Sequence, residues 1–192
     1  GVSVAETVQA EACSQGCDEL IRTERLGLTE LESRHLVPFT EMHSDPEVMA
    51  DLGGPIDAHD SPRKFDRYRM AFREYGVARW AVEDRGGAFL GYAGVMPRMS
   101  PEHPLGAHFE VGWRFVRSAW GNGYATESAR ASLDHAVHAL GLADILAYTS
   151  AENLRSQSVM KKLGLVRCPT LDFAQETASG ALWNGLVWQV CP

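Results

Sequence analysis

The first third of the chain has a short alternating pattern, followed by apolar residues at helical spacing. Residues 22–29 alternate well enough to predict a strand with Leu26 and Leu28 on one face. A short helix capped by Thr29 is expected next. Its apolar side chains are Leu31, Leu36, Phe39 and Met42.

Two prolines indicate where the following helices begin. Pro46 should occupy the first position of a short helix over residues 47–51, and Gly53 should end it. Ser61 and Pro62 predict the capped start of a longer helix. The single apolar face of that helix would contain Phe65, Tyr68 and Phe72.

The middle of the chain predicts a β-meander, and the remainder alternates helices with strands. Meander strands are expected over residues 77–83, 88–96 and 107–115. After them we expect a helix over 121–140, a strand over 145–149, a helix over 153–163 and a terminal strand over 182–190. The terminal strand should pair near Val166 or Asp172. This order predicts a mixed α+β domain.

Length and charge narrow the class of protein. The 192 residues fit one domain with a large core, and we interpret residues 1–18 as a flexible leader before a domain over residues 19–192. The net charge of −7 argues against a nucleic-acid partner. It also weakly favours cationic or amine-bearing substrates through long-range attraction.

The cysteines indicate neither a metal centre nor a disulfide framework. Cys13, Cys17, Cys168 and Cys191 have no zinc-site spacing, so no metal is expected. No apolar run is long enough to span a membrane, and the first residues lack the pattern of a signal peptide. We therefore expect a reduced, cytoplasmic protein without a membrane partner.

Two glycines separate the third meander strand from the long helix. Gly121 and Gly123 allow a sharp turn and let a ligand approach the backbone amides. The first amides of a helix have no partner within it and lie at the positive end of its dipole, so they form an anion site. A phosphate-bearing ligand is the direct inference, with a plain turn as the alternative.

Several separated segments together resemble one family. They are R-T-E-R-L at 22–26, S-D-P-E-V-M at 44–49, F-E-V-G-W at 109–113, W-G-N-G-Y-A-T-E at 120–127, and Asn153 with Ser156 before V-M-K-K-L-G-L at 159–165. In this order and spacing the chain resembles the GNAT superfamily of acyl-CoA-dependent N-acyltransferases, and within it the RimJ/RimL-like branch. The resemblance covers residues 20 to 190.

The resemblance implies both a fold and a co-substrate. The fold would be a central, twisted, mostly antiparallel sheet with flanking helices, splayed between the family's strands four and five, here residues 107–116 and 145–149. Acetyl-CoA would lie in the splay with its pyrophosphate on the helix amides. The implied contacts are Phe115, Val116, Trp120, Gly121, Asn122, Gly123, Tyr124, Ala125, Thr126 and Asn153.

Two residues are candidates for proton transfer. Glu110 could deprotonate the amine directly or through water, and partial burial would raise its pKa towards the working range. Alternatively, Glu110 is a solvated carboxylate or an ion-pair partner of an arginine such as Arg114. The tyrosine that many family members use as the acid is replaced here by Met160. Ser156 could relay a proton in its place, or could simply cap or pack its helix.

The acceptor and the assembly remain open from the sequence. The branch points to a protein N-terminus, while a small-molecule amine is equally compatible. A homodimer could form through the apolar terminal strand over residues 182–190, if that strand is an edge. The rival interpretations are a catalytically inactive acyl-CoA-binding module and a globular protein whose glycine-rich turn binds nothing.

Overall fold

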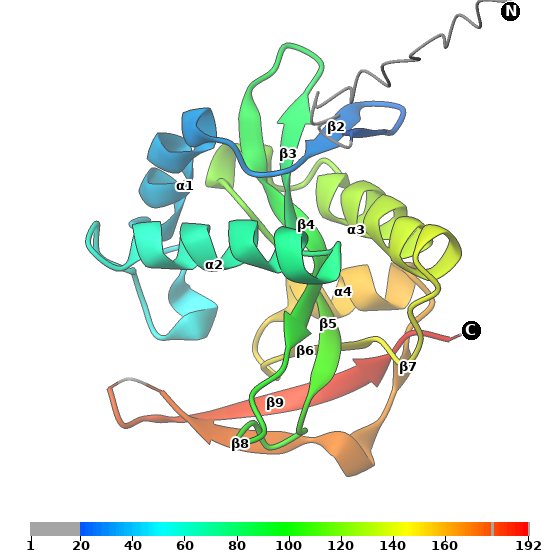
Figure 1. Ribbon diagram of the computed structural model, residues 1–192. Coiled ribbons are helices and arrows are strands. Elements are labelled where there is room, and N and C mark those ends of the chain that lie inside the picture. The colour runs from blue at the N-terminus through cyan, green and yellow to red at the C-terminus, as the bar shows by residue number, and fades with distance from the viewer. Residues whose placement is uncertain (1–19, 178, 192) are drawn as a thin grey trace, which may run out of the picture.

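The computed structural model describes residues 20–177 and 179–191 as an open, curved sheet with helices on both faces (Figure 1). The expected leader over residues 1–18, with Cys13 and Cys17, lies outside the described residues. Among the described residues, no helix is both long and apolar enough to cross a membrane.

The sheet has nine strands in the order β1-β2-β3-β4-β5-β6-β9-β7, with β8 paired to β9. The strands are β1 (Leu20–Arg22), β2 (Leu26–Thr29), β3 (Arg79–Asp84), β4 (Phe89–Arg98), β5 (His108–Phe115), β6 (Leu146–Thr149), β7 (Val166–Arg167), β8 (Phe173–Glu176) and β9 (Leu182–Gln189). Every pairing is antiparallel except that of β5 with β6. The mixed, mostly antiparallel sheet predicted from the sequence is confirmed.

The helices begin later than the sequence pattern suggested at several points. They are α1 (Leu36–His43), α2 (Ser61–Tyr75), α3 (Tyr124–Asp134) and α4 (Leu154–Lys162), with a π-helical turn, His135–Ala139, continuing α3. Short 3-10 turns cover Ser33–His35, Ala50–Leu52 (η2), Arg117–Ala119 and Pro169–Leu171.

Three local predictions in the first part of the chain were wrong. The single strand over residues 22–29 is a tight hairpin of β1 and β2, in which Leu20 pairs with Thr29. Thr29 therefore ends a strand and caps no helix. The segment expected to be helical over residues 47–51 is no α-helix, and only the turn η2 forms there. Gly53 ends that turn, as predicted, and has the left-handed conformation.

The two faces of the sheet are covered by different helices. Tyr92 of β4 lies 5.7 Å from Phe39 of α1 and 5.5 Å from Tyr68 of α2, measured between ring centroids. Neighbouring residues of a strand point to opposite faces, so Ala93 and its cross-strand partner Trp80 face the other way. Trp80 contacts His135 in the turn that continues α3, and it also meets Phe72 near the end of α2. Figure 1 shows α2 crossing in front of β4.

The sheet is splayed between β5 and β6. These strands are in register only at Glu110 and Leu146, whereas β4 and β5 are paired along eight residues from His108 to Phe115. The predicted splay is therefore present in the backbone. Side chains still pack across it, because one hydrophobic cluster contains Val111 of β5 together with Ile145 and Met160 on the other side.

The terminal strand is an interior strand. β9 pairs with β6 on one side and with β7 and β8 on the other, which confirms its expected pairing near Val166 and Asp172. The prediction that the whole strand offers an edge for a second copy of the chain is wrong, because residues 186–189 are paired on one side with β6 while β7 and β8 occupy the other side.

Candidate active site

Two cavities adjoin at the splay. The first, of about 360 Å³, lies on the α2 side and extends from Tyr68 to Trp183. The second, of about 310 Å³, is a groove between β5, the start of α3, and α4. The residues that line both are Asp51, Trp113, Arg114 and Ser156. Two molecules, one in each cavity, could therefore meet at these four residues.

The glycine turn shapes one end of the groove. Gly121 and Gly123 have φ values of +79° and +77°, which side chains with a Cβ rarely adopt. α3 begins only at Tyr124. The Glu127 amide donates a hydrogen bond to the Gly123 carbonyl at 3.1 Å, which is the first backbone bond of this helix. The amides of residues 124–126 are thus the unpaired helix start that favours an anion.

Cations and an aromatic ring complete the wall of the groove. Arg155 lies with its guanidinium 3.3 Å from the centroid of the Trp120 ring, and Lys162 also lines the groove. The Trp120 indole donates to the Phe115 carbonyl at 3.0 Å, which fixes the ring against β5. The groove therefore combines a helix start, an apolar wall and two positive side chains besides Arg114.

Two predicted cofactor contacts lie outside the set of described residues that line the groove. The Asn122 amide donates to the carbonyls of Ala119 and Trp120 at 3.0 and 3.1 Å, so its side chain holds the turn together. The Val116 amide donates to the Leu90 carbonyl at 3.0 Å and is not available to a ligand. Hydrogen bonding alternates along an antiparallel pair, so the Phe115 amide faces the splay instead.

Asn153 organises the junction between the cavities. It is the N-cap of α4 and accepts a bond from the Ser156 amide at 3.2 Å, while its own amide lies 3.4 Å from Asp51. Ser156 lines both cavities from the first turn of α4. Asp51, which the sequence analysis did not single out, accepts both Arg114 Nη atoms at 2.9 and 3.1 Å. No local pattern could have indicated that pairing.

Glu110 is a buried ion-pair partner. Only 6% of the residue is exposed, and both carboxylate oxygens accept from Arg79, while Arg98 lies 3.7 Å away. Burial raises the pKa of Glu110, but the two arginines outweigh it and hold that pKa below its ordinary value. The expectation of a raised pKa is therefore wrong, and the arginine partner is Arg79 in place of Arg114.

Gly112 provides the space for this ion pair. A Cβ at this position would lie 2.5 Å from Arg79 Nη2 and 3.1 Å from Glu110 Oε2. The Arg79 guanidinium also donates to the Gly94 and Glu110 carbonyls, at 2.6 and 2.9 Å. Arg79 thus connects β3, β4 and β5 directly beneath the first cavity.

Tyr68 contributes an unusual hydroxyl to the same cavity. Sequence analysis placed it only on an apolar helix face. Burial raises the pKa of Tyr68, but Lys64 and two neighbouring arginines outweigh it and lower that pKa to about 7. Burial and Glu110 raise the pKa of Tyr148 on the opposite wall, where its hydroxyl is 3.1 Å from His108 Nε2.

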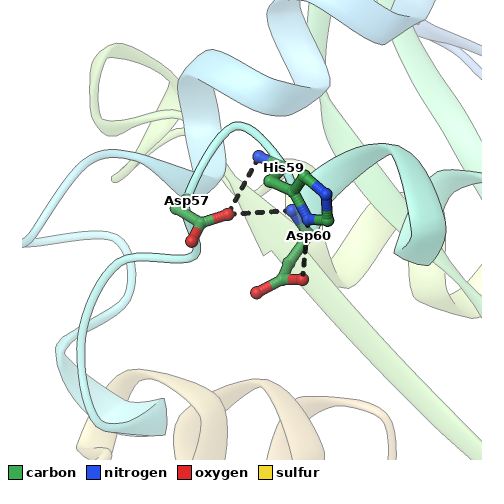
Figure 2. A group of neighbouring side chains, drawn as sticks. All are labelled: Asp57, His59 and Asp60. Atoms are coloured by element: carbon green, nitrogen blue, oxygen red, sulfur yellow. Dashed lines mark hydrogen bonds and ion pairs between the residues drawn. The ribbon is translucent and has the colours of Figure 1, made fainter.

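One group of possible metal ligands lies outside both cavities. Figure 2 shows Asp57, His59 and Asp60 in the exposed loop before α2. The Asp57 carboxylate accepts the amides of His59 and Asp60, each at 2.9 Å, and so forms the turn that leads into the helix. This arrangement explains the cluster as loop structure, and Ser61, predicted as the cap, is the first residue of the helix itself.

Comparison with known proteins identifies the family. Residues 25–166 match the model of the acetyltransferase (GNAT) domain, so the chain belongs to the GNAT acetyltransferase family. It is 40% identical to the uncharacterized N-acetyltransferase YnaD of Bacillus subtilis over 77% of this chain and 82% of that protein. It is 30% identical to an FsC-acetyl coenzyme A-N(2)-transacetylase of Aspergillus fumigatus over 87% of this chain and 73% of the relative.

Solved structures show the same fold. An acetyltransferase from Agrobacterium tumefaciens superposes with a TM-score of 0.75 at 24% identity, covering 91% of this chain and 95% of that one. A spermidine N-acetyltransferase from Vibrio cholerae, in complex with CoA and spermine, gives 0.67 at 17% identity, covering 87% and 95%. The GNAT fold binds acetyl-CoA, and the protein is accordingly an acetyltransferase.

Proposed function

We propose that the protein is an N-acetyltransferase that moves acetyl from acetyl-CoA to a primary amine by direct attack in a ternary complex. The main support is the meeting of two cavities at Asp51, Trp113, Arg114 and Ser156. A ternary mechanism requires two substrate sites that open to one another, because the amine must reach the thioester carbonyl while both molecules are bound.

The groove fits the donor. The amides at the start of α3 suit a pyrophosphate, with Thr126 beside them and Lys162 and Arg155 supplying positive charge. The Phe115 amide faces the splay, where an extended pantetheine arm would lie. It would also be placed to donate to the oxyanion that forms during attack.

Proton movements would involve residues at and beside the junction. As the amine nitrogen bonds to the carbonyl carbon and the carbon–sulfur bond breaks, the nitrogen loses a proton and the thiolate gains one. Glu110 is our candidate acceptor, through water, although its lowered pKa makes it a weak base. Ser156 is the candidate relay to the thiolate, because it lines both cavities.

The finer assignment is a RimJ/RimL-like enzyme that acts on a protein N-terminus or a small-molecule amine. At the level of fold, a proposed ribosomal-protein-serine acetyltransferase of Vibrio cholerae supports it, with a TM-score of 0.72 at 15% identity over 91% of this chain and 98% of that one. A homodimer remains part of the proposal, but not through β9.

The first test is thermal melting with and without acetyl-CoA, followed by thiol release with mixed amines and N-terminal peptides. Saturation at a hundred times the dissociation constant should add about 2.7 kcal/mol to the free energy of unfolding. Stabilisation with release supports the proposal. Stabilisation without release from any amine favours the inactive acyl-CoA-binding module, and absence of stabilisation would refute the donor site.

A further inference from the structure

The first cavity contains more positive charge than its carboxylates neutralise. Four cationic side chains line it, and two have a carboxylate partner of their own: Arg79 binds Glu110, although its Nε has no partner among the described residues, and Arg114 binds both oxygens of Asp51. The cations are Lys64, Arg79, Arg98 and Arg114. The positive charges of the other two, Lys64 and Arg98, have no carboxylate of their own.

Lys64 lines the cavity without a carboxylate partner among the described residues. Its ammonium group lies 5.8 Å from the centroid of the Tyr68 ring. Burial lowers the pKa of Lys64 and the neighbouring arginines add to this effect, while the Tyr68 hydroxyl opposes it. An anion bound in the cavity would compensate the charge of the ammonium form.

Arg98 is only partly satisfied. Its Nε is buried and has no hydrogen-bond partner among the described residues. Its closest carboxylate oxygen is Glu110 Oε1 at 3.7 Å, and that carboxylate already binds Arg79. Buried donors are normally paired, so an unpaired Nε next to a cavity indicates a missing acceptor.

The remaining acidic residue of the lining does not offset this surplus. Glu176 lies on β8 at the exposed end of the cavity. Four cations against the carboxylates of Asp51, Glu110 and Glu176 leave 4 − 3 = +1 for the lining while Tyr68 is neutral, below its pKa of about 7. The positive groups without a carboxylate of their own are Lys64 and Arg98. This local charge is opposite to the net charge of −7 for the chain.

We infer that the acceptor is a primary amine that also bears an anionic group, a carboxylate or a phosphate, which binds between Lys64 and Arg98. The inference rests on the proposed function, since it assigns this cavity to the acceptor. It selects against polyamines, whose additional positive charge would meet Lys64 and Arg98. It corrects the weak preference for cationic substrates that the net charge suggested.

Matched amines test the inference by thiol release. One set is β-alanine, O-phosphoethanolamine, ethanolamine and ethylenediamine; a longer set is 6-aminohexanoate, 6-aminohexanol and 1,6-diaminohexane. We expect kcat/KM to be at least about tenfold higher for the anionic member of each set, because one charge-assisted hydrogen bond stabilises binding by about that factor. The two-carbon set distinguishes a carboxylate from a phosphate.

Lysine variants connect the preference to the cavity. Lys64→Met should raise KM for the preferred anionic amine about tenfold or more and leave the amino alcohol unchanged, while Lys64→Arg should retain the preference. Lys161→Met, at an exposed position of α4 outside both cavities, is the matched control. Preference for the neutral or dicationic amine, or equal loss with Lys161→Met, would overturn the inference while leaving acetyl transfer intact.

A binding measurement covers the case in which no amine in the panel reacts. The melting temperature of CoA-loaded protein is measured without additive, with 6-acetamidohexanoate and with 6-acetamidohexanol. A shift with the acid alone, lost in Lys64→Met, supports the anion site. Equal or absent shifts refute it, and the separate melt with acetyl-CoA reports on the donor site.

Discussion

Asp51 and Arg114 form a two-point ion pair that connects η2 to β5 across 63 residues of sequence, with N–O distances of 2.9 and 3.1 Å. The same Arg114 donates to the Val48 carbonyl at 2.6 Å, and the Trp183 indole of β9 donates to the Asp51 carbonyl at 3.2 Å. One acidic residue in a short turn therefore holds three parts of the chain at the junction of the cavities.

Replacing Asp51 by alanine should destabilise the protein and reduce activity. The Arg114 guanidinium would lose its counter-ion in a nearly buried position, which costs about 2 kcal/mol or more. Urea unfolding would report the loss of stability, and thiol release the loss of activity. The control is Asp45→Ala, which breaks the more exposed pair with Arg117 and should cost clearly less stability. Equal losses for the two variants would contradict the role given to Asp51.

Glu110→Gln tests the candidate base. If Glu110 accepts the amine proton, acetyl transfer should fall on the order of a hundredfold, while the thermal shift with acetyl-CoA stays near normal. Unchanged transfer would remove Glu110 from the mechanism and leave it as the structural partner of Arg79.

The stability contribution of Glu110 has a defined pH window. Its pKa in the folded protein is held below the ordinary value of 4.5, so its ionised form stabilises the fold. That contribution is complete above pH 4.5 and is lost as the pH falls through the folded-state pKa. The stability difference between the wild type and Glu110→Gln, measured by urea unfolding, should therefore narrow below this pH and stay constant from there to neutrality.

Gly112→Ala should disturb the same ion pair sterically. The added methyl group would lie 2.5 Å from Arg79 Nη2, so the guanidinium must move, at a cost of about 1–3 kcal/mol. Gly27→Ala is the matched strand glycine, because its Cβ would meet only Leu20 Cδ1 at 3.7 Å. If the Gly112→Ala protein were as stable as Gly27→Ala, the Arg79 guanidinium would have moved away from the added methyl group without a loss of stability.

Gly121→Val tests the donor groove against a strain-matched control. Gly121 and Gly141 have φ values of +79° and +67°, and a Cβ at either meets nothing within 4 Å. Both valines should therefore cost similar stability through backbone strain. Only Gly121→Val should reduce the thermal shift with acetyl-CoA, because only Gly121 lines the groove. Similar shifts in both variants would contradict that assignment.

Tyr68 should ionise near neutral pH. Its lowered pKa of about 7 predicts a tyrosinate absorbance step in the near ultraviolet that disappears in Tyr68→Phe. Because the folded-state pKa lies below the usual value of 10.0, the associated stabilisation is complete above pH 10.0 and is lost as the pH falls through 7. Tyr75→Phe, at the exposed end of α2, should leave the step in place.

Local signals allowed much of this fold to be predicted. The i, i+3 and i+7 spacing of Phe65, Tyr68 and Phe72 identified α2, and all three are buried. The alternating strands identified the meander, and Gly121 with Gly123 located the start of α3 and the groove. These features depend on residues that are neighbours in the sequence.

Contacts between distant segments could not be predicted in the same way. Glu110 was expected to have a raised pKa because no local pattern shows that Arg79, 31 residues earlier, lies beside it in the sheet. Asp51 and Lys64 come from a turn and a helix whose positions depend on tertiary packing. The charge of the first cavity is therefore a property of the fold, and the sequence total of −7 indicated the opposite sign.

The single register pair between Glu110 and Leu146 also bears on how the domain denatures. The two halves of the sheet therefore share little backbone bonding at their boundary and are joined there by side-chain packing, as of Val111 with Ile145. A molecule that occupies the splay and bonds to both sides adds the coupling that the backbone lacks. Occupancy of the groove would then raise the cooperativity with which the two halves unfold.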